Sequence, residues 1–199
     1  VYPQTKGTKL VGCARTLRFV AGREDLFKKH GGGLNEQKKV FDTVREGEVI
    51  VIEGRQEAGS GTLGDILALR AQTRGAAGVV TDGGVRDYEA VREIGLPVFT
   101  QGAHPCVLGR KHVPWDSDIA ISCGNATVVP GDVIVGDDDG VIVIPRELAE
   151  EIADGALAKE HEDEWVAGQV AQGASLDGLF PPTGENKKAY QRFRDSEGA

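Results

Sequence analysis

The sequence contains no methionine and only three cysteines, Cys13, Cys106 and Cys123. An odd number of cysteines at spacings that match no metal pattern does not predict a disulfide framework. We therefore expect inert thiols in a reducing compartment. The sequence begins at Val1 within what reads as mid-domain sequence, which leaves open whether a further N-terminal segment precedes it.

Basic residues are also in the minority. The chain has 23 Lys and Arg against 31 Asp and Glu, a net charge of −8. A nucleic-acid binder needs a basic patch that releases counterions, so we expect no nucleic-acid partner. No apolar run approaches the roughly 18–20 residues that span a bilayer, and residues 1–10 lack the apolar segment of a signal peptide. These absences predict a cytoplasmic protein without a membrane partner.

The composition itself is that of a globular protein, with 40% hydrophobic and 27% charged residues among 199. This length suits one domain, or one domain with a helical appendage. We expect an α/β core over residues 1–145. Residues 146–199 are predicted to form a C-terminal helix and extension that contacts a neighbouring subunit.

Hydrophobic patterning predicts strands at residues 11–19, 49–52, 79–81 and 97–100. Residues 49–52 are a continuous β-branched run, as expected for a strand buried on both faces. Residues 39–44 predict a short helical turn. A helix is predicted from Gly64-Asp65 to Gly75, and a second over residues 87–94. The order βαβαβ implies a parallel sheet.

The pattern changes after residue 118. Short strands are predicted at residues 119–122, 126–129, 133–135 and 141–144, separated by glycine-rich turns. Such closely spaced strands favour a second, mainly antiparallel sheet packed near the first. A helix is predicted over residues 146–170, and the remaining residues read as an extension.

Two segments are expected to meet at the carboxyl ends of the parallel strands, where ligands bind in such sheets. The first is the start of the helix at Gly64, Asp65, Ile66 and Leu67, whose free N–H groups could hold a carboxylate. The second is residues 82–87, Asp-Gly-Gly-Val-Arg-Asp.

The residue types at this rim suit the chemistry of oxo-acids. Asp87 is a hard oxygen ligand for Mg²⁺ or Mn²⁺, and Arg86 is a planar fork that grips a carboxylate or stabilises an enolate oxygen. Asp65 could orient a water molecule. Gly83 and Gly84 would let the backbone approach the ligand closely. No lysine in either segment is placed for a Schiff base.

Residue types alone leave a structural alternative open. Asp65 could be a helix N-cap, and Asp82-Gly83-Gly84 a turn. No two of the four histidines have the spacing of paired metal ligands on a helix, and we expect structural or surface roles for them. They are His30, His104, His112 and His161.

The rim segments resemble a known family. Gly64-Asp65, residues 70–78 (Arg-Ala-Gln-Thr-Arg-Gly-Ala-Ala-Gly) and residues 81–87 (Thr-Asp-Gly-Gly-Val-Arg-Asp) are similar to the 4-hydroxy-4-methyl-2-oxoglutarate/4-carboxy-4-hydroxy-2-oxoadipate aldolases. That superfamily also contains the regulators of ribonuclease activity A. Its pattern is Asp, twenty residues, then Arg-Asp, which Asp65 and Arg86-Asp87 satisfy without a gap. The resemblance covers roughly residues 10–170.

The resemblance implies a layered α/β/β/α swivelling-type domain that assembles as homotrimers or homohexamers. It implies a divalent-metal-dependent aldolase that cleaves 4-hydroxy-2-oxo-dicarboxylic or tricarboxylic acids to pyruvate and a second oxo-acid, with oxaloacetate decarboxylation as a further activity. The metal ligand falls on Asp87, the substrate arginine on Arg86 and the water-organising carboxylate on Asp65. The substrate-binding helix N-terminus falls on residues 64–67.

The family aldolases also use a glutamate of the C-terminal helix that reaches a neighbouring subunit's site. Glu160 and Glu164 are the candidates, although a solvated acidic face explains residues 159–164 equally well. A different class of function is also open, a protein-binding regulator of ribonuclease activity without catalysis. The Asp and Arg-Asp pattern does not separate the two. The roughly fifty residues after the last predicted strand favour the aldolase, because the regulators are compact.

Overall fold

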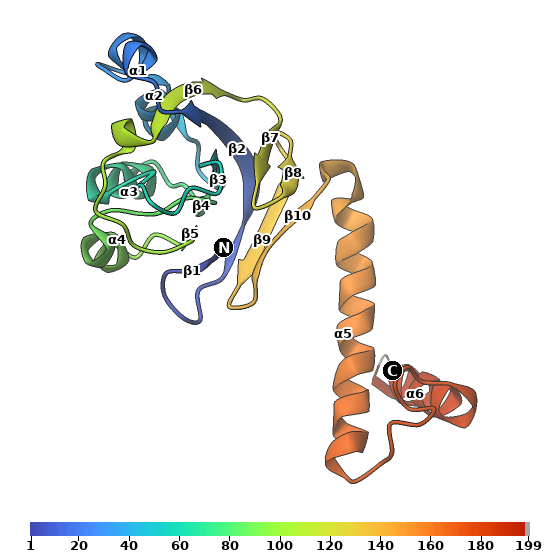
Figure 1. Cartoon of the computed structure of the whole chain (residues 1–199). Helices are drawn as coiled ribbons and strands as arrows, with labels where there is room; N and C mark the ends of the chain where they lie inside the picture. The colour runs from blue at the N-terminus through green and yellow to red at the C-terminus, as the bar shows by residue number, and fades with distance from the viewer. Residues whose placement is uncertain (198–199) are drawn as a thin grey trace. The chain divides into compact units, whose positions relative to one another are not determined.

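The computed structural model describes residues 1–197, and the chain divides into two compact units, Val1–Arg146 and a second that begins at Glu147. The first unit carries the strands with their covering helices, and the second carries two helices (Figure 1). Whether the second unit contacts a neighbouring subunit stays a prediction. Within residues 1–197, no helix combines the length and apolar character that a bilayer crossing requires.

A mixed eight-stranded sheet forms the centre of the first unit. Four adjacent strands at its centre run parallel to one another: β2 (Leu10–Ala21), β3 (Glu48–Glu53), β4 (Gly78–Thr81) and β5 (Val98–Thr100). Four strands pair antiparallel around them: β1 (Tyr2–Pro3), β6 (His112–Ser117), β9 (Val133–Asp137) and β10 (Gly140–Ile144). The predicted parallel βαβαβ core is confirmed.

Strand β2 is long enough to pair with three others. One of its edges pairs with β3 from Cys13 to Arg18. The other edge pairs first with β9, from Leu10 to Cys13, and then with β6, from Leu17 to Ala21. The sheet also curls, because β1 at one end of the strand order approaches β9 and β10 at the other. It therefore comes close to closing into a barrel.

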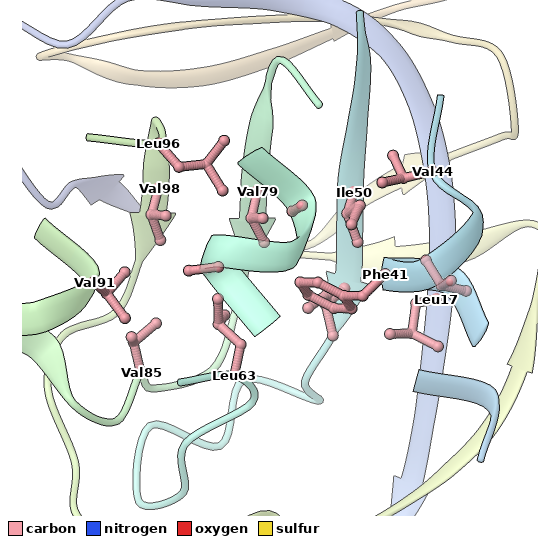
Figure 2. Packing of buried hydrophobic residues seen from close by; sticks show 14 of the residues in the cluster. Leu17, Phe41, Val44, Ile50, Leu63, Val79, Val85, Val91, Leu96 and Val98 are labelled. Carbon is pink, nitrogen blue, oxygen red and sulfur yellow. The ribbon is translucent and has the colours of Figure 1, made fainter. Parts of the chain in front are cut away.

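The central strands are buried on both faces, as their β-branched runs predict. Successive side chains alternate between faces. One set packs on the helix side of the sheet (Figure 2): Ile50, Ile52, Val79 and Val98. The other set packs on the opposite face: Val49, Val51, Val80 and Phe99.

The first unit has four α-helices, of which the last three lie where the sequence predicts helical structure. They are α1 (Glu24–His30), α2 (Glu36–Thr43), α3 (Asp65–Thr73) and α4 (Tyr88–Ile94). Asn35 begins α2, because its side chain accepts a hydrogen bond from the Lys38 N–H at 3.0 Å. Gly95 ends α4 in the left-handed conformation, with φ 80°. Helix α1 and strand β6 were not predicted from the sequence.

A small second sheet covers the face opposite the helices. It consists of β7 (Ile121–Cys123) and β8 (Ala126–Val128), whose Ile121, Cys123 and Val128 join the cluster around Phe99. The other two strands expected in this sheet, β9 and β10, instead extend the main sheet, because the first four residues of β2 offer β9 a free edge. The predicted fold class, a layered α/β swivelling-type domain with a second antiparallel sheet and a C-terminal helical arm, is confirmed.

The second unit contains α5 (Ala149–Ala171), preceded by a 3-10 turn at Arg146–Leu148, and α6 (Gly184–Glu197). Helix α5 matches the predicted helix, whereas α6 lies where only an extension was expected. The two helices are joined by apolar contacts, among them Trp165 against Tyr190 with ring centroids 5.6 Å apart. Val166 and Leu179 are buried within this unit.

Candidate functional site

Three loops leave the carboxyl ends of β3, β4 and β5 and remain bonded to one another. The Thr62 N–H donates to the Gly84 carbonyl at 2.8 Å, and the Gly84 N–H donates to the Ser60 carbonyl at 3.1 Å. On the other side, the Val85 N–H donates to the Gly102 carbonyl at 2.9 Å. These bonds continue the parallel pairing beyond the strands, so the loops form a fixed rim rather than separate flexible turns.

The rim rests directly on the hydrophobic core. Leu63 and Val85, 3% and 0% exposed, belong to the cluster between the sheet and the helices (Figure 2). Leu63 immediately precedes Gly64, the N-cap residue of α3, and Val85 immediately precedes Arg86. The backbone is further tied at this point by a 2.9 Å hydrogen bond from the Arg86 N–H to the Leu63 carbonyl. Burial of these two side chains therefore fixes the positions from which the polar groups project.

A cavity of about 530 Å³ opens at this rim, within the range of 300–1,000 Å³ typical of small-molecule sites. All six residues predicted to bind substrate or metal in the first unit line its wall: Gly64, Asp65, Ile66, Leu67, Arg86 and Asp87. Their gathering is an observation of the structure, and their roles stay predictions. The sequence did not predict the remaining walls, among them Phe27 of α1, Gln37 of α2 and residues 107–110.

Arg86 and Asp87 form an ion pair at the cavity wall. The distance from Arg86 Nη2 to Asp87 Oδ2 is 3.2 Å, with the two side chains 35% and 41% exposed. Both groups keep part of their surface open to the cavity. The guanidinium can therefore bind an anion while it also neutralises the neighbouring carboxylate.

Two glycines make room for this pair. A Cβ atom at position 61 would overlap Arg86 Cγ, and one at position 64 would lie 2.6 Å from Asp87 Oδ2. The Asp87 carboxylate thus lies against the backbone at the start of α3, where the partial positive charge of the helix end favours an anion. Glycine is therefore required at positions 61 and 64, because the side chains of Arg86 and Asp87 approach the backbone too closely there to leave room for a Cβ atom.

The backbone of Asp87 is in the left-handed conformation, with φ 51° and ψ 41°. Asp tolerates this region better than most residues, although it costs conformational energy and is frequent at functional sites. Asp87 stands just before α4, and among the described residues its carboxylate bonds to Arg86 and not to the N–H groups of that helix. The side chain is therefore free to face the cavity.

Asp65 is the first residue of α3, after Gly64 at the N-cap position. Its Oδ1 accepts a hydrogen bond from the Ile66 N–H at 2.8 Å. Asp65 is therefore not the N-cap residue, as the structural alternative had it, but lies one residue further along, in the helix itself. The start of α3 borders the cavity. The first N–H groups of a helix lack carbonyl partners within it, and of those in α3 the Ile66 N–H donates to the Asp65 side chain.

Asp82 and the two glycines after it serve the scaffold. Asp82 is 1% exposed and its carboxylate accepts hydrogen bonds from the N–H groups of Gly54, Gln56 and Gly124. Burial raises its pKa, while these hydrogen bonds oppose the rise. Asp82 therefore ties the loop after β3 to the turn between β7 and β8.

Gly83 and Gly84 do not line the cavity, which agrees with a role as scaffold for Arg86 and Asp87. They are buried, and a Cβ atom would lie 2.5 Å from Thr62 Cγ2 at position 83 and 2.7 Å from the Ala58 carbonyl oxygen at position 84. Their small size brings two loops together. The two glycines thus support the rim without facing the cavity.

The donor set suits a hard cation that keeps most of its water. Within residues 1–197 no group of three His, Cys, Asp or Glu side chains could enclose a metal. Mg²⁺ is ordinarily held by one or two carboxylates and retains several waters, and Asp87 offers one such carboxylate at the wall of the cavity. Asp87 is thus a carboxylate that suits Mg²⁺ or Mn²⁺, and its role as a metal ligand stays a prediction.

Glu160 and Glu164 lie on α5 in the second unit and are exposed. Their expected contribution to a neighbouring subunit's site stays a prediction. His104, by contrast, is held within the rim, where its Nδ1 accepts a hydrogen bond from the Cys106 N–H at 3.1 Å.

Comparisons with known proteins match most of the chain to one family. A family model described as RraA-like: Aldolase/RraA matches residues 1–143. A protein of Halalkalibacterium halodurans named "Putative 4-hydroxy-4-methyl-2-oxoglutarate aldolase" is 32% identical over 164 residues, which cover 82% of this chain and 73% of that protein. Protein DlpA of Legionella pneumophila is 29% identical over 177 residues, 89% of this chain, and the chain spans 28% of the length of DlpA.

A solved structure is also similar. It is Streptomyces coelicolor RraAS2, titled an unusual member of the RNase ES inhibitor RraA protein family. It is 35% identical, with a TM-score of 0.73, and the match covers 82% of this chain and 79% of that one. The chain belongs to the RraA-like family.

Proposed function

We propose that this chain is a carbon–carbon lyase that cleaves 4-hydroxy-2-oxo-dicarboxylic or tricarboxylic acids to pyruvate and a second oxo-acid, with Mg²⁺ or Mn²⁺ as its cofactor. The observation that carries the proposal is the gathering of Arg86, Asp87 and the start of α3 around one cavity of about 530 Å³. The name of the relative from H. halodurans supports the same class of reaction.

The oxo-acid end of the substrate binds between two sources of positive charge. The first N–H groups of α3 bind its carboxylate, as helix N-termini bind anions elsewhere. Arg86 donates to the 2-oxo oxygen, where negative charge develops in the transition state. A divalent cation held by Asp87 would act as a Lewis acid that polarises the same carbonyl.

Cleavage then follows a retro-aldol course. A water molecule oriented by Asp65 takes the proton from the 4-hydroxyl group, a carbonyl forms at C4, and the bond between C3 and C4 breaks. The electron pair of that bond becomes the C2–C3 double bond of a pyruvate enolate, whose oxygen Arg86 stabilises. A proton from water at C3 completes pyruvate.

Oxaloacetate decarboxylation is proposed as a second reaction at the same residues. Loss of CO₂ from oxaloacetate leaves the same pyruvate enolate, so it needs the same binding of the oxo-acid end and the same stabilisation by Arg86. No general base is required, because the departing carboxylate carries no proton. Asp65 should therefore matter less for decarboxylation than for aldol cleavage.

We further propose a cytoplasmic homotrimer or homohexamer, in which Glu160 or Glu164 of one subunit approaches the cavity of the next. The exposed acidic face of α5 makes these side chains available for such a contact. This part of the proposal rests on the family resemblance.

A second candidate is a protein-binding regulator of ribonuclease activity without catalysis. The observation that favours it is the 35% identity to RraAS2, whose title names the RNase ES inhibitor family. The cavity and its arginine are not explained by this function alone.

The two functions are separated by measuring pyruvate release with a lactate-dehydrogenase-coupled assay. The panel is several 4-hydroxy-2-oxo-acids and oxaloacetate, with Mg²⁺ or Mn²⁺ present. Arg86→Ala and Asp87→Ala should each lower kcat/KM by about 100-fold or more, because each removes a charge that acts on the developing enolate. Arg92→Ala, on the exposed face of α4, is the matched control and should keep wild-type activity.

Melting temperatures near that of the wild type would show that the variants fold. Wild-type rates of pyruvate release in both Arg86→Ala and Asp87→Ala would contradict the proposal. No turnover on the whole panel, together with retention of RNase ES in a pull-down, would favour the regulator instead.

A further inference from the structure

Gln37 lines the cavity with an amide group that the proposed chemistry does not use. It is the second residue of α2, and only 6% of its surface is exposed. Its Nε2 donates a hydrogen bond to the Thr62 carbonyl. A carbonyl oxygen can only accept, so this bond fixes which end of the amide is nitrogen and leaves Oε1 as the free end.

Gln37 Oε1 accepts no hydrogen bond from any described residue. It is not among the enclosed, unpartnered side-chain atoms of residues 1–197, so it retains accessible surface, which faces the cavity that Gln37 lines. Thr62 also lines the cavity, but its hydroxyl is already bonded to Thr81 Oγ1 at 2.9 Å and to the Gly84 carbonyl at 3.0 Å. Leaving a largely buried acceptor without a donor is costly, so Gln37 calls for a donor from within the cavity.

The amide is fixed close to Asp65 along the chain. Thr62, to which it bonds, stands three residues before Asp65 on the same loop. On the other side, α2 is anchored in the core by the buried side chains of Val40 and Phe41. Asp65 Oδ1 accepts from the Ile66 N–H, whereas its Oδ2 has no donor among the described residues. The cavity wall therefore presents two acceptors from one subunit, a carboxylate and a neutral amide.

Two acceptors do for a water molecule what one cannot. A water that donates one hydrogen to Asp65 still rotates about that bond, so its lone pairs point in no fixed direction. A second acceptor holds the other hydrogen and directs a lone pair at the substrate. An amide oxygen suits this place, because it adds no negative charge beside an anionic substrate and takes up no proton at neutral pH.

We infer that Gln37 is a positioning residue, whose Oε1 accepts a hydrogen bond from the water that Asp65 holds by its other hydrogen. This inference rests on the proposed function. The proton of the 4-hydroxyl group passes to the water oxygen, and the water passes one of its own protons to the Asp65 carboxylate. The bond between C3 and C4 then breaks to give the enolate, while Gln37 neither gains nor loses a proton.

The test compares two reactions that share the cavity but differ in their need for a base. Gln37→Met keeps the length of the side chain and removes the amide. It should lower kcat for 4-hydroxy-4-methyl-2-oxoglutarate by about 10- to 100-fold, since a misplaced base costs rate, and change KM less than about twofold, since the water does not bind substrate. Oxaloacetate decarboxylation, which needs no base, should change less than about twofold. Lys38→Met, at the next and exposed position of α2, is the control and should leave both reactions unaffected.

The ratio of the two reactions separates positioning from structural support, because damage to the rim would slow both through Arg86 and Asp87. Equal losses in both reactions, or a loss of aldol cleavage that lies in KM, would overturn the role of Gln37. Unchanged aldol cleavage in Gln37→Met would overturn it too, and would favour Glu160 or Glu164 of a neighbouring subunit as the second acceptor.

The wild type tests the proposed function separately. If it cleaves the hydroxy-acid but does not decarboxylate oxaloacetate, a loss confined to kcat supports the inference. No pyruvate from the hydroxy-acid with the wild type would overturn the proposed aldolase and the inference with it.

Discussion

At the scale of single residues, the candidate site depends on what two glycines lack. Arg86 lies across Gly61, and the Asp87 carboxylate lies against Gly64. Arg86 and Asp87 could be predicted as site residues because they end a strand-to-helix loop in a specific pattern. The need for glycine at position 61 could not be predicted, since it follows from the contact with Arg86, which is 25 residues away in the sequence. Arg110, which also lines the cavity, could not be predicted either, because no local pattern marks an arginine at the end of a short 3-10 turn.

Gly61→Ala tests this close approach. The new methyl group would collide with the Arg86 side chain near its root, so Arg86 must shift. We expect kcat/KM for pyruvate release to fall at least about tenfold, and the free energy of unfolding to fall by about 1–3 kcal/mol, as for other overpacked sites. Gly32→Ala, where a Cβ atom meets nothing within 4 Å, is the control. Equal activity in the two variants would contradict the described packing.

At the scale of elements, the central strands could be predicted because each is a short β-branched run between turn residues. The pairing of the strands, by contrast, could not be predicted. The patterns of β9 and β10 fit a second sheet as well as the first, and only the length of β2 decides between them. Strand β6 escaped prediction because it contains Pro114 and polar neighbours. It pairs along the edge of β2 across an irregularity in register at Arg18 and Phe19.

Strand β6, which was not predicted from the sequence, contains a histidine whose protonation makes the stability of the protein depend on pH. His112 is 0% exposed, packs 5.6 Å from the ring of Phe19, and neither ring nitrogen has a hydrogen-bond partner among the described residues. Burial, assisted by the charge of Arg55, lowers the pKa of His112 to about 4 from 6.5. Between these two values the unfolded chain binds a proton that the folded protein does not. Stability contributed by neutral His112 is thus complete above pH 6.5 and is lost as the pH falls toward 4.

Urea unfolding at pH 7.5 and pH 5 measures this effect. The wild type should lose about 2 kcal/mol more than His112→Leu between the two pH values, since the variant has no proton to take up on unfolding. Subtracting the loss measured for the variant from that of the wild type removes the contribution of other titrating groups, including Asp82, whose raised pKa acts in the opposite direction. The same pH dependence in both proteins would show that His112 is not held neutral.

At the scale of the whole molecule, the second unit exposes apolar side chains that a homo-oligomer would cover. On α5, Leu157 is 64% exposed and Ile152 is 39% exposed. If the proposed trimer or hexamer forms through this helix, Leu157→Glu should lower the mass measured by light scattering toward that of one chain, because burial of a carboxylate in an apolar contact is costly. Lys159→Gln, two residues further along α5, is the control for a change of charge alone. A wild-type protein that is monomeric at all concentrations would contradict the proposed assembly.

We propose above that this family member releases pyruvate with a divalent cation held at Asp87. The most direct measurement is pyruvate release from 4-hydroxy-4-methyl-2-oxoglutarate by the wild-type protein, before chelator treatment, after it, and after Mg²⁺ or Mn²⁺ is restored. The chelator should abolish pyruvate release, and either cation should restore it in the wild type but not in Asp87→Ala. Full activity in the chelator-treated, metal-free protein would contradict it.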